Sequence, residues 1–440
     1  MKRLVLDILQ TWKLNPDRYP LLLRGARQVG KTWVIREHGR LYSHFVEINL
    51  EAEPEYISLF KDHYGDPHSL LRAIGFLKNK KIEEEGTLLF IDEIQSSPEA
   101  LLSLRYFREK KPGFPVIAAG SLLEFTLKEI SFPVGRIQFI HLFPMNFEEY
   151  LLAQKKEDLL QAIFELPSQA SLPNSVHEKL LEEVALYYFI GGMPKVLQTY
   201  VDSGDLVQCQ EHQQMIVANF REDFHKYASR ANLHYLQILF QAVPRWIGQK
   251  FTYSRVDPHL RSRELSTALN LLEQAGLVYK AYHSSANGSP LGSQINPKKF
   301  KVFFLDVGLC QRILGLNLSQ LYLQRKDLLA HRGSMAEQWV AQELLSYTPK
   351  NQSPEIYYWQ REEKSALAEV DLLLQKEASI FPFEVKSGEA RPTKSLNIFL
   401  NEKEKYIPRG FIVSTSPYFK DSRITQLPFY ALPLLEKNIL

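Results

Sequence analysis

Cysteine is scarce in this chain, and long hydrophobic runs are missing from it. Cys209 and Cys310 are the two cysteines among 440 residues, so no CxxC pair occurs. They supply neither a zinc site nor a disulfide framework, which suits a reducing compartment. The longest weakly polar stretch, residues 184–193, has about half of the roughly twenty residues that a membrane-spanning helix needs. These absences predict a cytoplasmic protein that makes no membrane contact.

The first residues also lack the uninterrupted apolar run of a secretory signal peptide, because Asp7 and Gln10 break it. Apolar residues make up 45% of the chain and charged residues 23%. This composition is typical of a folded globular protein and excludes a disordered, collagenous or low-complexity one. At about 150 residues per domain, the length predicts about three domains.

An excess of one charge sign is missing as well. The chain has 53 Lys and Arg against 50 Asp and Glu, a net charge of +3. The charge is unevenly distributed, however, because residues 245–305 carry nine Lys and Arg against three Asp and Glu. A basic middle segment indicates an acidic partner such as DNA.

Apolar runs alternate with helical patterns over the first 150 residues. We interpret 67–78 and 98–110 as helices, and the strands are expected at 19–24, 44–50, 87–92 and 115–120. Strands that alternate with helices predict an α/β domain whose parallel sheet is covered on both faces.

The rest of the chain predicts three further regions. Residues 151–228 are helical in pattern, and residues 229–322 contain three helix-like segments before a pair of strands. Residues 323–440 begin with a helix and form another α/β region. Its later elements are expected at 356–360, 370–374, 380–386 and 410–414 as strands and at 395–406 as a helix.

The sequence RGARQVGKT at residues 24–32 contains G-x-x-x-x-G-K-[ST] between an apolar strand and a helix. Its glycines allow backbone N–H groups to face a phosphate, and the helix N-terminus adds partial positive charge. Lys31 is predicted to reach the β- and γ-phosphates of ATP, and Thr32 to ligate Mg²⁺. The predicted nucleotide-binding residues are Gly25, Ala26, Arg27, Gln28, Val29, Gly30, Lys31 and Thr32. The alternative is a glycine-containing turn with a surface lysine, which the strand-loop-helix context disfavours.

A second element of the nucleotide site is the apolar run LLFIDE at residues 88–93. Asp92 is predicted to hold Mg²⁺, and Glu93 to polarise the attacking water as a general base. Such a run is common at the surface end of a strand, but its place after Thr32 in the same α/β pattern favours a catalytic role. Hydrolysis is the stronger expectation, although some proteins of this kind only switch with nucleotide state.

Two further residues are weaker candidates. Ser121 follows the predicted strand at 115–120 and is a candidate sensor of the γ-phosphate, with a plain turn as the alternative. Arg136 is a candidate cation for the γ-phosphate, supplied in cis or by a neighbouring copy. A solvated arginine at the start of a strand is its equally weighted alternative.

The C-terminal region contains a set of acidic residues and a lysine. Glu384 lies thirteen residues after Asp371, and Lys386 shares a strand face with Glu384 because side chains alternate along a strand. If the two strands pair, Asp371 and Glu384 come close enough to hold Mg²⁺ or Mn²⁺, with Glu337 as a further carboxylate. Lys386 would then orient a water or neutralise phosphate charge. This predicts a metal-dependent phosphodiesterase site; the alternative is a hairpin edge that carries charges.

Residues 253–276 have the outline of a winged helix-turn-helix. Its second helix would present Arg261, Arg263 and Asn270 outward, toward a DNA groove. A spacer that contacts proteins is the alternative.

Motifs along nearly the whole chain resemble those of prokaryotic AAA-type ATPases related to the archaeal and STAND-like group. The N-terminal motifs are GARQVGKT, FVEINLE, LLFIDEIQ, AAGS and GRIQFIHLFPMNFEEYL; the middle ones are YFIGGMPKVL, YLQILFQAVP, LEQAGLVYKAY and VFFLDVGL; the C-terminal ones are GSMAEQWVAQEL, IYYWQ, EVDLLL and FEVKSGE. The resemblance implies an AAA-type P-loop core at 1–150, a helical lid at 151–228, a winged-helix-like module at 229–322 and a restriction-endonuclease-like domain at 323–440.

The resemblance also implies roles for individual residues. It places ATP binding and hydrolysis at Gly30, Lys31, Thr32, Asp92 and Glu93, and a PD-(D/E)xK type site at Asp371, Glu384 and Lys386. The sequence departs from that motif where Glu369-Val370 replaces a proline before Asp371.

Three functional interpretations follow. The first is an ATPase coupled to DNA binding or to metal-dependent DNA cleavage. The second is a nucleotide-gated switch that binds DNA or protein through an inactive nuclease-like domain. The third, compatible with either, is an adaptor that forms a homo-oligomer through its ATPase region.

Overall fold

The computed structural model describes residues 1–437 apart from 122, 124, 126–134, 170, 229, 316–332, 362–367 and 390–393. The chain divides into two compact units. The N-terminal unit comprises residues 2–143 and 349–353, and the C-terminal unit comprises residue 1 together with 144–348 and 354–440.

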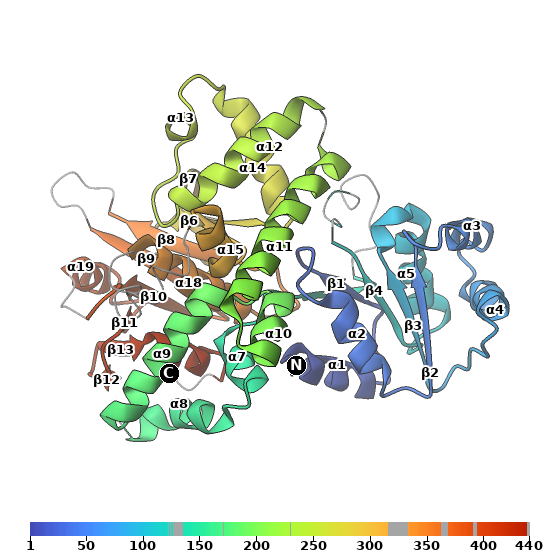
Figure 1. Ribbon diagram of the computed structural model, residues 1–440, viewed down its shortest axis with the longest axis horizontal. Helices are drawn as coiled ribbons and strands as arrows, with labels where there is room; N and C mark the ends of the chain where they lie inside the picture. Colours follow the sequence, from blue (N-terminus) through green and yellow to red (C-terminus); the bar gives the residue numbers. More distant parts are fainter. Residues whose placement is uncertain are drawn as a thin grey trace. The chain divides into compact units, whose positions relative to one another are not determined.

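The N-terminal unit is built on a five-stranded parallel sheet (Figure 1). Its strands are β1 (Leu21–Arg24), β2 (His44–Asn49), β3 (Thr87–Asp92), β4 (Val116–Ala119) and β5 (Gln138–His141). Their order is β2-β3-β4-β1-β5. Every residue of β3 and β4 is buried, as continuous apolar runs in a sheet covered on both faces require. The prediction of a parallel α/β sheet in this part of the chain is confirmed.

Helices connect these strands and begin at clear sequence signals. They are α1 (Val5–Leu14), α2 (Lys31–Gly39), α3 (Glu55–Asp62), α4 (Pro67–Lys78) and α5 (Pro98–Lys110). The Asp66 carboxylate accepts hydrogen bonds from two backbone N–H groups in the first turn of α4, and the Ser97 hydroxyl accepts one at the start of α5. Each cap is followed by a proline, whose fixed φ suits a first helical residue. The predicted bounds of these two helices are therefore correct.

The C-terminal unit begins with a run of helices. They are α7 (Phe147–Ala153), α8 (Glu157–Gln169), α9 (Asn174–Ile190), α10 (Pro194–Ser203) and α11 (Leu206–Tyr227). The next are α12 (Arg230–Ala242), α13 (Tyr253–Val256), α14 (Ser262–Gln274) and α15 (Val307–Ile313), followed later in the chain by α18 (Gly333–Ser346) and α19 (Lys394–Glu402). No helix in the part of the chain that the structure describes is long and apolar enough to cross a membrane.

The same unit contains a mixed sheet of eight strands. The strands are β6 (Val278–Ser284), β7 (Ile295–Phe304), β8 (Ile356–Gln360), β9 (Glu369–Lys376), β10 (Ser379–Val385), β11 (Gly410–Ser414), β12 (Phe419–Lys420) and β13 (Ile424–Pro428). Their order is β12-β13-β11-β10-β9-β8-β6-β7. Strand β6 pairs in parallel with β8, with Tyr282 opposite Tyr357. Strands from both sides of the predicted boundary at residue 322 therefore share one sheet.

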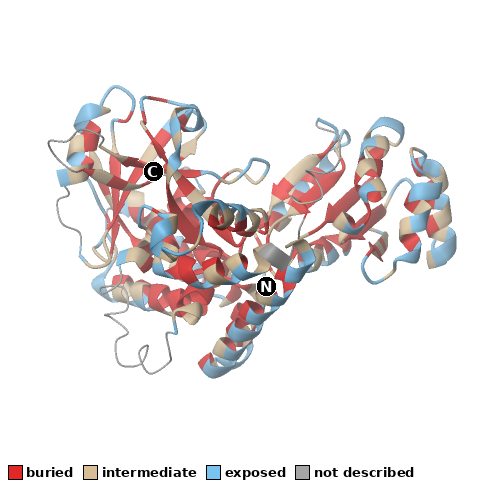
Figure 2. Ribbon diagram, turned by 90° about the horizontal axis from the view of Figure 1, so that it is seen from above, coloured by how far each residue is buried: buried red, intermediate tan, exposed pale blue. Residues whose placement is uncertain are grey.

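Helix α18 packs on this sheet and is buried along almost its whole length. Figure 2 shows that buried residues are concentrated in the strands and in the helix faces packed against them. Glu343 of α18 is fully buried, and the carboxylate accepts hydrogen bonds from the backbone N–H of Phe147 and the Tyr347 hydroxyl. Burial raises the pKa of Glu343 to about 7. Gln342, the residue directly before Glu343, donates to Asp306, which also accepts from the backbone N–H of Gly192. The side chains of Glu343, Gln342 and Asp306 thus each have hydrogen-bond partners, as burial of polar groups requires.

Candidate nucleotide site and acidic cluster

The phosphate loop joins β1 to α2 and has backbone conformations that favour glycine. Gly25 has a φ of +144°, and a Cβ there would lie 2.2 Å from the Leu142 carbonyl oxygen. Gly30, directly before α2, has a φ of +94°. Gln28 is also left-handed, with a φ of 66°. The loop therefore curls as a phosphate-binding loop does, with the first turn of α2 opening from it.

Lys31 lies at the start of α2 with its side chain folded back over this loop. Its ammonium donates to the carbonyl oxygens of Gly25, at 2.9 Å, and Ala26, at 2.8 Å. Burial lowers the pKa of Lys31 to about 8, and the carboxylates of Glu93 and Asp92 oppose this shift. The lysine is thus a buried cation held at the loop, beside two acids.

Thr32 and Asp92 connect the loop to β3. The Thr32 hydroxyl donates to Asp92 Oδ2 at 2.8 Å, although the two residues are 60 positions apart. They meet because the strands are parallel, so the carboxyl ends of β1 and β3 lie at one edge of the sheet, on either side of β4. Burial raises the pKa of Asp92, and Glu93 adds to this effect. A hydroxyl and a carboxylate oxygen are ligands that fit Mg²⁺.

Glu93 is held at this edge by a residue that the sequence analysis did not single out. Its backbone has a left-handed φ of 50°, and its carboxylate accepts a hydrogen bond of 2.6 Å from Gln95 Nε2. The Gln95 amide in turn lies against the end of β4, because a Cβ on Gly120 would come within 2.3 Å of Gln95 Oε1. Gln95 is therefore a positioning residue for Glu93, and the motif DEIQ was its only sequence signal.

The two weaker candidates lie at opposite edges of this sheet. Ser121 comes two residues after β4, at the edge that holds Thr32 and Asp92. Arg136 precedes β5 and lies at the other edge, where its guanidinium pairs with Glu109 at 3.3 Å. The N-terminal unit thus does not bring Arg136 to the phosphate loop, and a role for it in a neighbouring copy stays a prediction.

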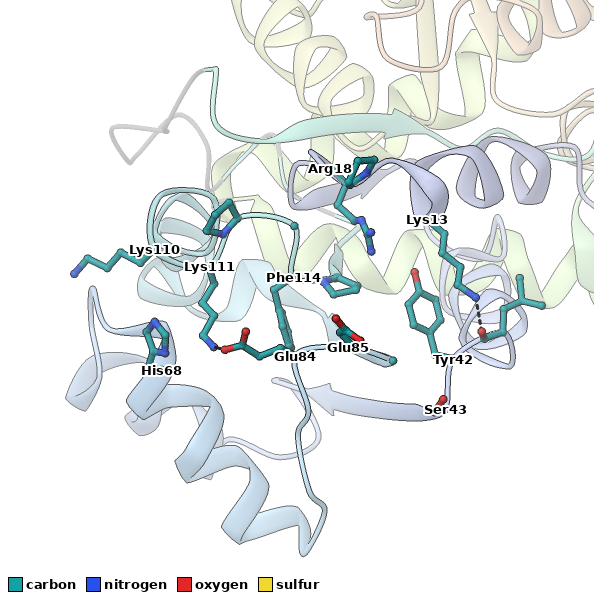
Figure 3. A pocket seen from close by; sticks show the side chains of 16 residues that line it. Lys13, Arg18, Tyr42, Ser43, His68, Glu84, Glu85, Lys110, Lys111 and Phe114 are labelled. Carbon is teal, nitrogen blue, oxygen red and sulfur yellow. Dashed lines mark hydrogen bonds and ion pairs between the residues drawn. The ribbon is translucent and has the colours of Figure 1, made fainter.

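A cavity of about 720 Å³ also lies at the amino-terminal edge of the strands (Figure 3). Ser43, Gly86 and Pro115, which directly precede β2, β3 and β4, line part of it. Other lining side chains are charged, and Lys111 pairs with Glu84 across it. The cavity is therefore distinct from the nucleotide site, which occupies the carboxyl ends of the same strands.

In the C-terminal unit, the structure brings together the predicted acidic residues and lysine. Strands β9 and β10 pair antiparallel, and Asp371 Oδ2 accepts a 2.8 Å hydrogen bond from the backbone N–H of Val385. Glu384 Oε1 accepts from Lys386 Nζ at 2.8 Å. Burial raises the pKa of Glu384, the charge of Asp371 raises it further, and Lys386 opposes both.

A lysine that sequence reasoning missed also lies in this cluster. Lys301 of β7 has 1% of its side chain exposed, and its Nζ contacts Glu369 at 2.6 Å, Glu337 at 3.3 Å and Asp371 at 3.8 Å. Burial alone would lower the pKa of Lys301, but the three carboxylates raise it overall. Among the described residues, no three His, Cys, Asp or Glu side chains are arranged to hold a metal ion. In the sequence, Lys301 is one of the nine basic residues of the segment 245–305. Its place between Phe300 and Val302 in an apolar run was the one signal of a buried position.

Helix α14 places its predicted outward residues at the surface. Arg261, Arg263 and Asn270 are all exposed. Asn270 is tied back to the hairpin, because Lys280 Nζ donates to its Oδ1 at 2.6 Å and to Glu273 at 2.7 Å. Of the three residues, Arg261 and Arg263 are thus the two that are exposed and do not contact Lys280 as Asn270 does.

Comparison with known protein families divides the chain into three segments. Residues 17–151 match an AAA domain. Residues 181–320 and 332–432 match two domains of unknown function, DUF8612 and DUF4143. No curated protein matches the chain. Together with the geometry of the loop, the first match identifies residues 17–151 as an AAA-type P-loop ATPase domain.

Similar solved structures are distant. The Walker-type ATPase PABY2304 of Pyrococcus abyssi is 17% identical, with a TM-score of 0.44 over 70% of this chain and 94% of that one. ORC1 of Aeropyrum pernix, solved in complex with DNA, is 11% identical, with a TM-score of 0.29 over 70% and 90%. The RuvB Holliday junction branch migration motor of Thermotoga maritima is 14% identical, with a TM-score of 0.27 over 62% and 86%. Similarities this weak support no inference about function.

Proposed function

We propose that the chain binds and hydrolyses ATP at the carboxyl edge of its N-terminal sheet. The observation that carries the proposal is the hydrogen bond between Thr32 and Asp92 beside the buried ammonium of Lys31. It joins the two halves of a phosphate-and-metal site that lie 60 residues apart in the sequence. An AAA domain match over residues 17–151 supports the same function.

Each residue of the site has a distinct role in this proposal. The backbone N–H groups of residues 25–30 and the first turn of α2 bind phosphate oxygens. Lys31 exchanges its loop carbonyl partners for the β- and γ-phosphates. Thr32 and Asp92 hold Mg²⁺, which neutralises phosphate charge when bound. Glu93, oriented by Gln95, takes the proton from the attacking water.

Replacing Thr32 by valine tests the metal half of the site. Valine keeps the shape of threonine but removes the hydroxyl, so the Mg²⁺ dependence of ATP turnover should weaken, with turnover at limiting Mg²⁺ falling at least about tenfold. The measurement is phosphate release over a series of Mg²⁺ concentrations. Thr11→Val on α1 is a matched control, because Thr11 is exposed and donates to a carbonyl of its own helix. An unchanged Mg²⁺ dependence in Thr32→Val would remove Thr32 as a metal ligand.

We propose further that the C-terminal unit binds DNA and that the nucleotide state of the N-terminal unit controls this binding. The exposed Arg261, directly before α14, and Arg263, in its first turn, support DNA contact, since exposed arginines suit a phosphate backbone. A second candidate function is metal-dependent cleavage of phosphodiesters. It is favoured by the proximity of Asp371, Glu384 and Lys386 on two paired strands.

One set of reactions separates DNA binding from DNA cleavage. Labelled linear, supercoiled and single-stranded DNA is incubated with Mg²⁺ or Mn²⁺, with and without ATP. We expect Arg261→Ala/Arg263→Ala to bind less tightly in fluorescence anisotropy and to lower the slope of log affinity against log salt by about two. Cutting by the wild type but not by Lys386→Ala would establish the nuclease. Binding without cutting would indicate that the C-terminal unit binds DNA but does not cleave it. If the chain neither binds nor cuts DNA, the proposal of a DNA partner is wrong.

A further inference from the structure

A buried ammonium occupies the centre of the acidic cluster. Lys301 reaches it from β7, the edge strand of the eight-stranded sheet. Its carboxylate partners come from two other elements: Glu337 from α18, and Glu369 and Asp371 from the start of β9. Lys301 Nζ also lies 3.5 Å from the backbone carbonyl oxygen of Asp371 and 5.4 Å from the ring centre of Tyr358. Four oxygen atoms from three residues thus face one nitrogen.

The cluster needs a cation because its acids outnumber its other bases. Glu337, Glu369, Asp371 and Glu384 bring four carboxylates, while Lys386 contacts Glu384. Glu384 is 6% exposed, and its second oxygen, Oε2, has no hydrogen-bond partner among the described residues. Glu337 and Asp371 each have 17% of their side chains exposed, and Glu369 has 38%. Carboxylates that are buried or crowded in this way are unfavourable without a compensating cation. Without Lys301, a metal ion or protons would have to neutralise them.

The backbone closes the cluster around Glu337. Gly248 has a φ of +72°, and a Cβ there would lie 2.8 Å from Glu337 Oε2. Two residues after Gly248, Lys250 forms a β-bridge with Lys301 itself. The segment before α13 therefore packs directly on the acids and on the strand that carries the lysine. A hydrated divalent ion would have to displace this lining as well as the ammonium.

We infer that the Lys301 ammonium is the resident cation of the acidic cluster and takes the position that a divalent metal ion would need. The residues do not fit a metal while Lys301 is in place, in agreement with the absence of a metal-holding group among the described side chains. Glu369, at which the sequence departs from the nuclease motif that it resembles, makes the shortest of the three carboxylate contacts. The residue at which the sequence departs from the motif, Glu369, thus provides a carboxylate that pairs with Lys301.

This inference rests on neither ATP hydrolysis nor DNA binding. It argues against metal-dependent DNA cleavage by the wild type, the second candidate function, because Lys301 holds the position that the metal ion would need. The test is a titration of the full chain with Mn²⁺ in the absence of nucleotide. Electron paramagnetic resonance measures the Mn²⁺ that stays free, and hence the amount bound. The variants are Lys301→Met, which keeps length without charge, and Lys301→Met combined with Asp371→Asn. Lys298→Met is the matched control, because Lys298 is an exposed lysine of the same strand. Asp371→Asn alone identifies any Mn²⁺ held at the cluster rather than at the phosphate loop.

We expect Lys301→Met to bind one additional Mn²⁺ per chain, at least about tenfold more tightly than any wild-type binding at the cluster. The additional ion should disappear in the double variant, and Lys298→Met should behave as the wild type. If Lys301→Met folds without gaining Mn²⁺, the inference is wrong. Wild-type Mn²⁺ binding that is as tight as that of Lys301→Met and that Asp371→Asn abolishes would also overturn it.

If Lys301→Met does not fold in metal-free buffer, Mn²⁺ binding by the wild type is compared with Mn²⁺ binding by Asp371→Asn. Thermal unfolding then provides a second readout. Mn²⁺ should raise the melting temperature of Lys301→Met, or allow it to fold, and should leave that of the wild type unchanged. A rise of the wild-type melting temperature that Asp371→Asn removes would contradict the inference.

Discussion

Lys31→Ala is expected to abolish ATP binding. The lysine is 8% exposed and already faces the phosphate loop, where its ammonium contacts the carbonyl oxygens of Gly25 and Ala26. Alanine removes the charge that would pair with the β- and γ-phosphates, and charge-assisted hydrogen bonds to phosphate are among the strongest that proteins make. We expect the Kd for ATP to rise at least about 100-fold, a loss of about 2.7 kcal/mol.

Isothermal titration calorimetry measures this change directly. Lys61→Ala is a suitable control, because Lys61 is an exposed lysine near the end of α3 in the same unit. Circular dichroism should show that both variants are folded, so that lost binding reflects the site. Tight ATP binding by Lys31→Ala would refute the phosphate-loop assignment.

Glu93→Gln is expected to separate nucleotide binding from hydrolysis. The amide keeps the size of the side chain but cannot accept the proton of the attacking water. Positioned general bases contribute about 10²- to 10⁴-fold, so turnover should fall within that range while ATP affinity changes little. The hydrogen bond from Gln95 to Glu93 can be replaced by one between two amides, which should preserve the local structure.

Steady-state phosphate release and ATP binding should be measured on the same preparation of this variant. Glu55→Gln is the matched control, because Glu55 is an exposed glutamate at the start of α3. Wild-type turnover by Glu93→Gln would exclude Glu93 as the base. Loss of ATP binding in this variant would instead indicate that the carboxylate has a structural role in the loop.

The two variants together distinguish an ATPase from a protein that only senses nucleotide. A sensor would lose its response in Lys31→Ala but would be indifferent to Glu93→Gln. If DNA binding depends on the ATP-bound state, Glu93→Gln would keep the protein in that state, because ATP binds but is not hydrolysed. DNA binding by this variant in the presence of ATP would therefore report which nucleotide state engages the partner.

The nucleotide site was readable from the sequence because its parts are local. The phosphate loop, its strand and the start of its helix lie within about a dozen residues, and Gly25 and Gly30 mark backbone conformations that other residues rarely adopt. The second part, Asp92, ends an apolar run that only a buried strand explains. The two helices whose bounds were predicted correctly begin at Pro67 and Pro98, and each follows a residue whose side chain caps the helix.

Contacts between distant segments were decided by the tertiary structure. Arg136 precedes β5, and the parallel pairing of β5 with β1 places it at the end of the strands opposite the phosphate loop. The pairing partner and direction of a strand cannot be read from its own composition. The Gln95 side chain lies against Gly120 because β3 and β4 pair side by side, a contact that joins segments 25 residues apart.

Lys301 shows this division between sequence and structure most clearly. In the sequence it is one of nine basic residues in a segment that indicated an acidic partner. In the fold it is buried, and its partners are carboxylates 36, 68 and 70 positions further along the chain. The sequence by itself thus determined the P-loop domain, its helices and its acidic strand end, because these follow from local periodicity and backbone preference. The tertiary structure alone decided which charges meet, because the energy of an ion pair depends on distance and burial rather than on position in the chain.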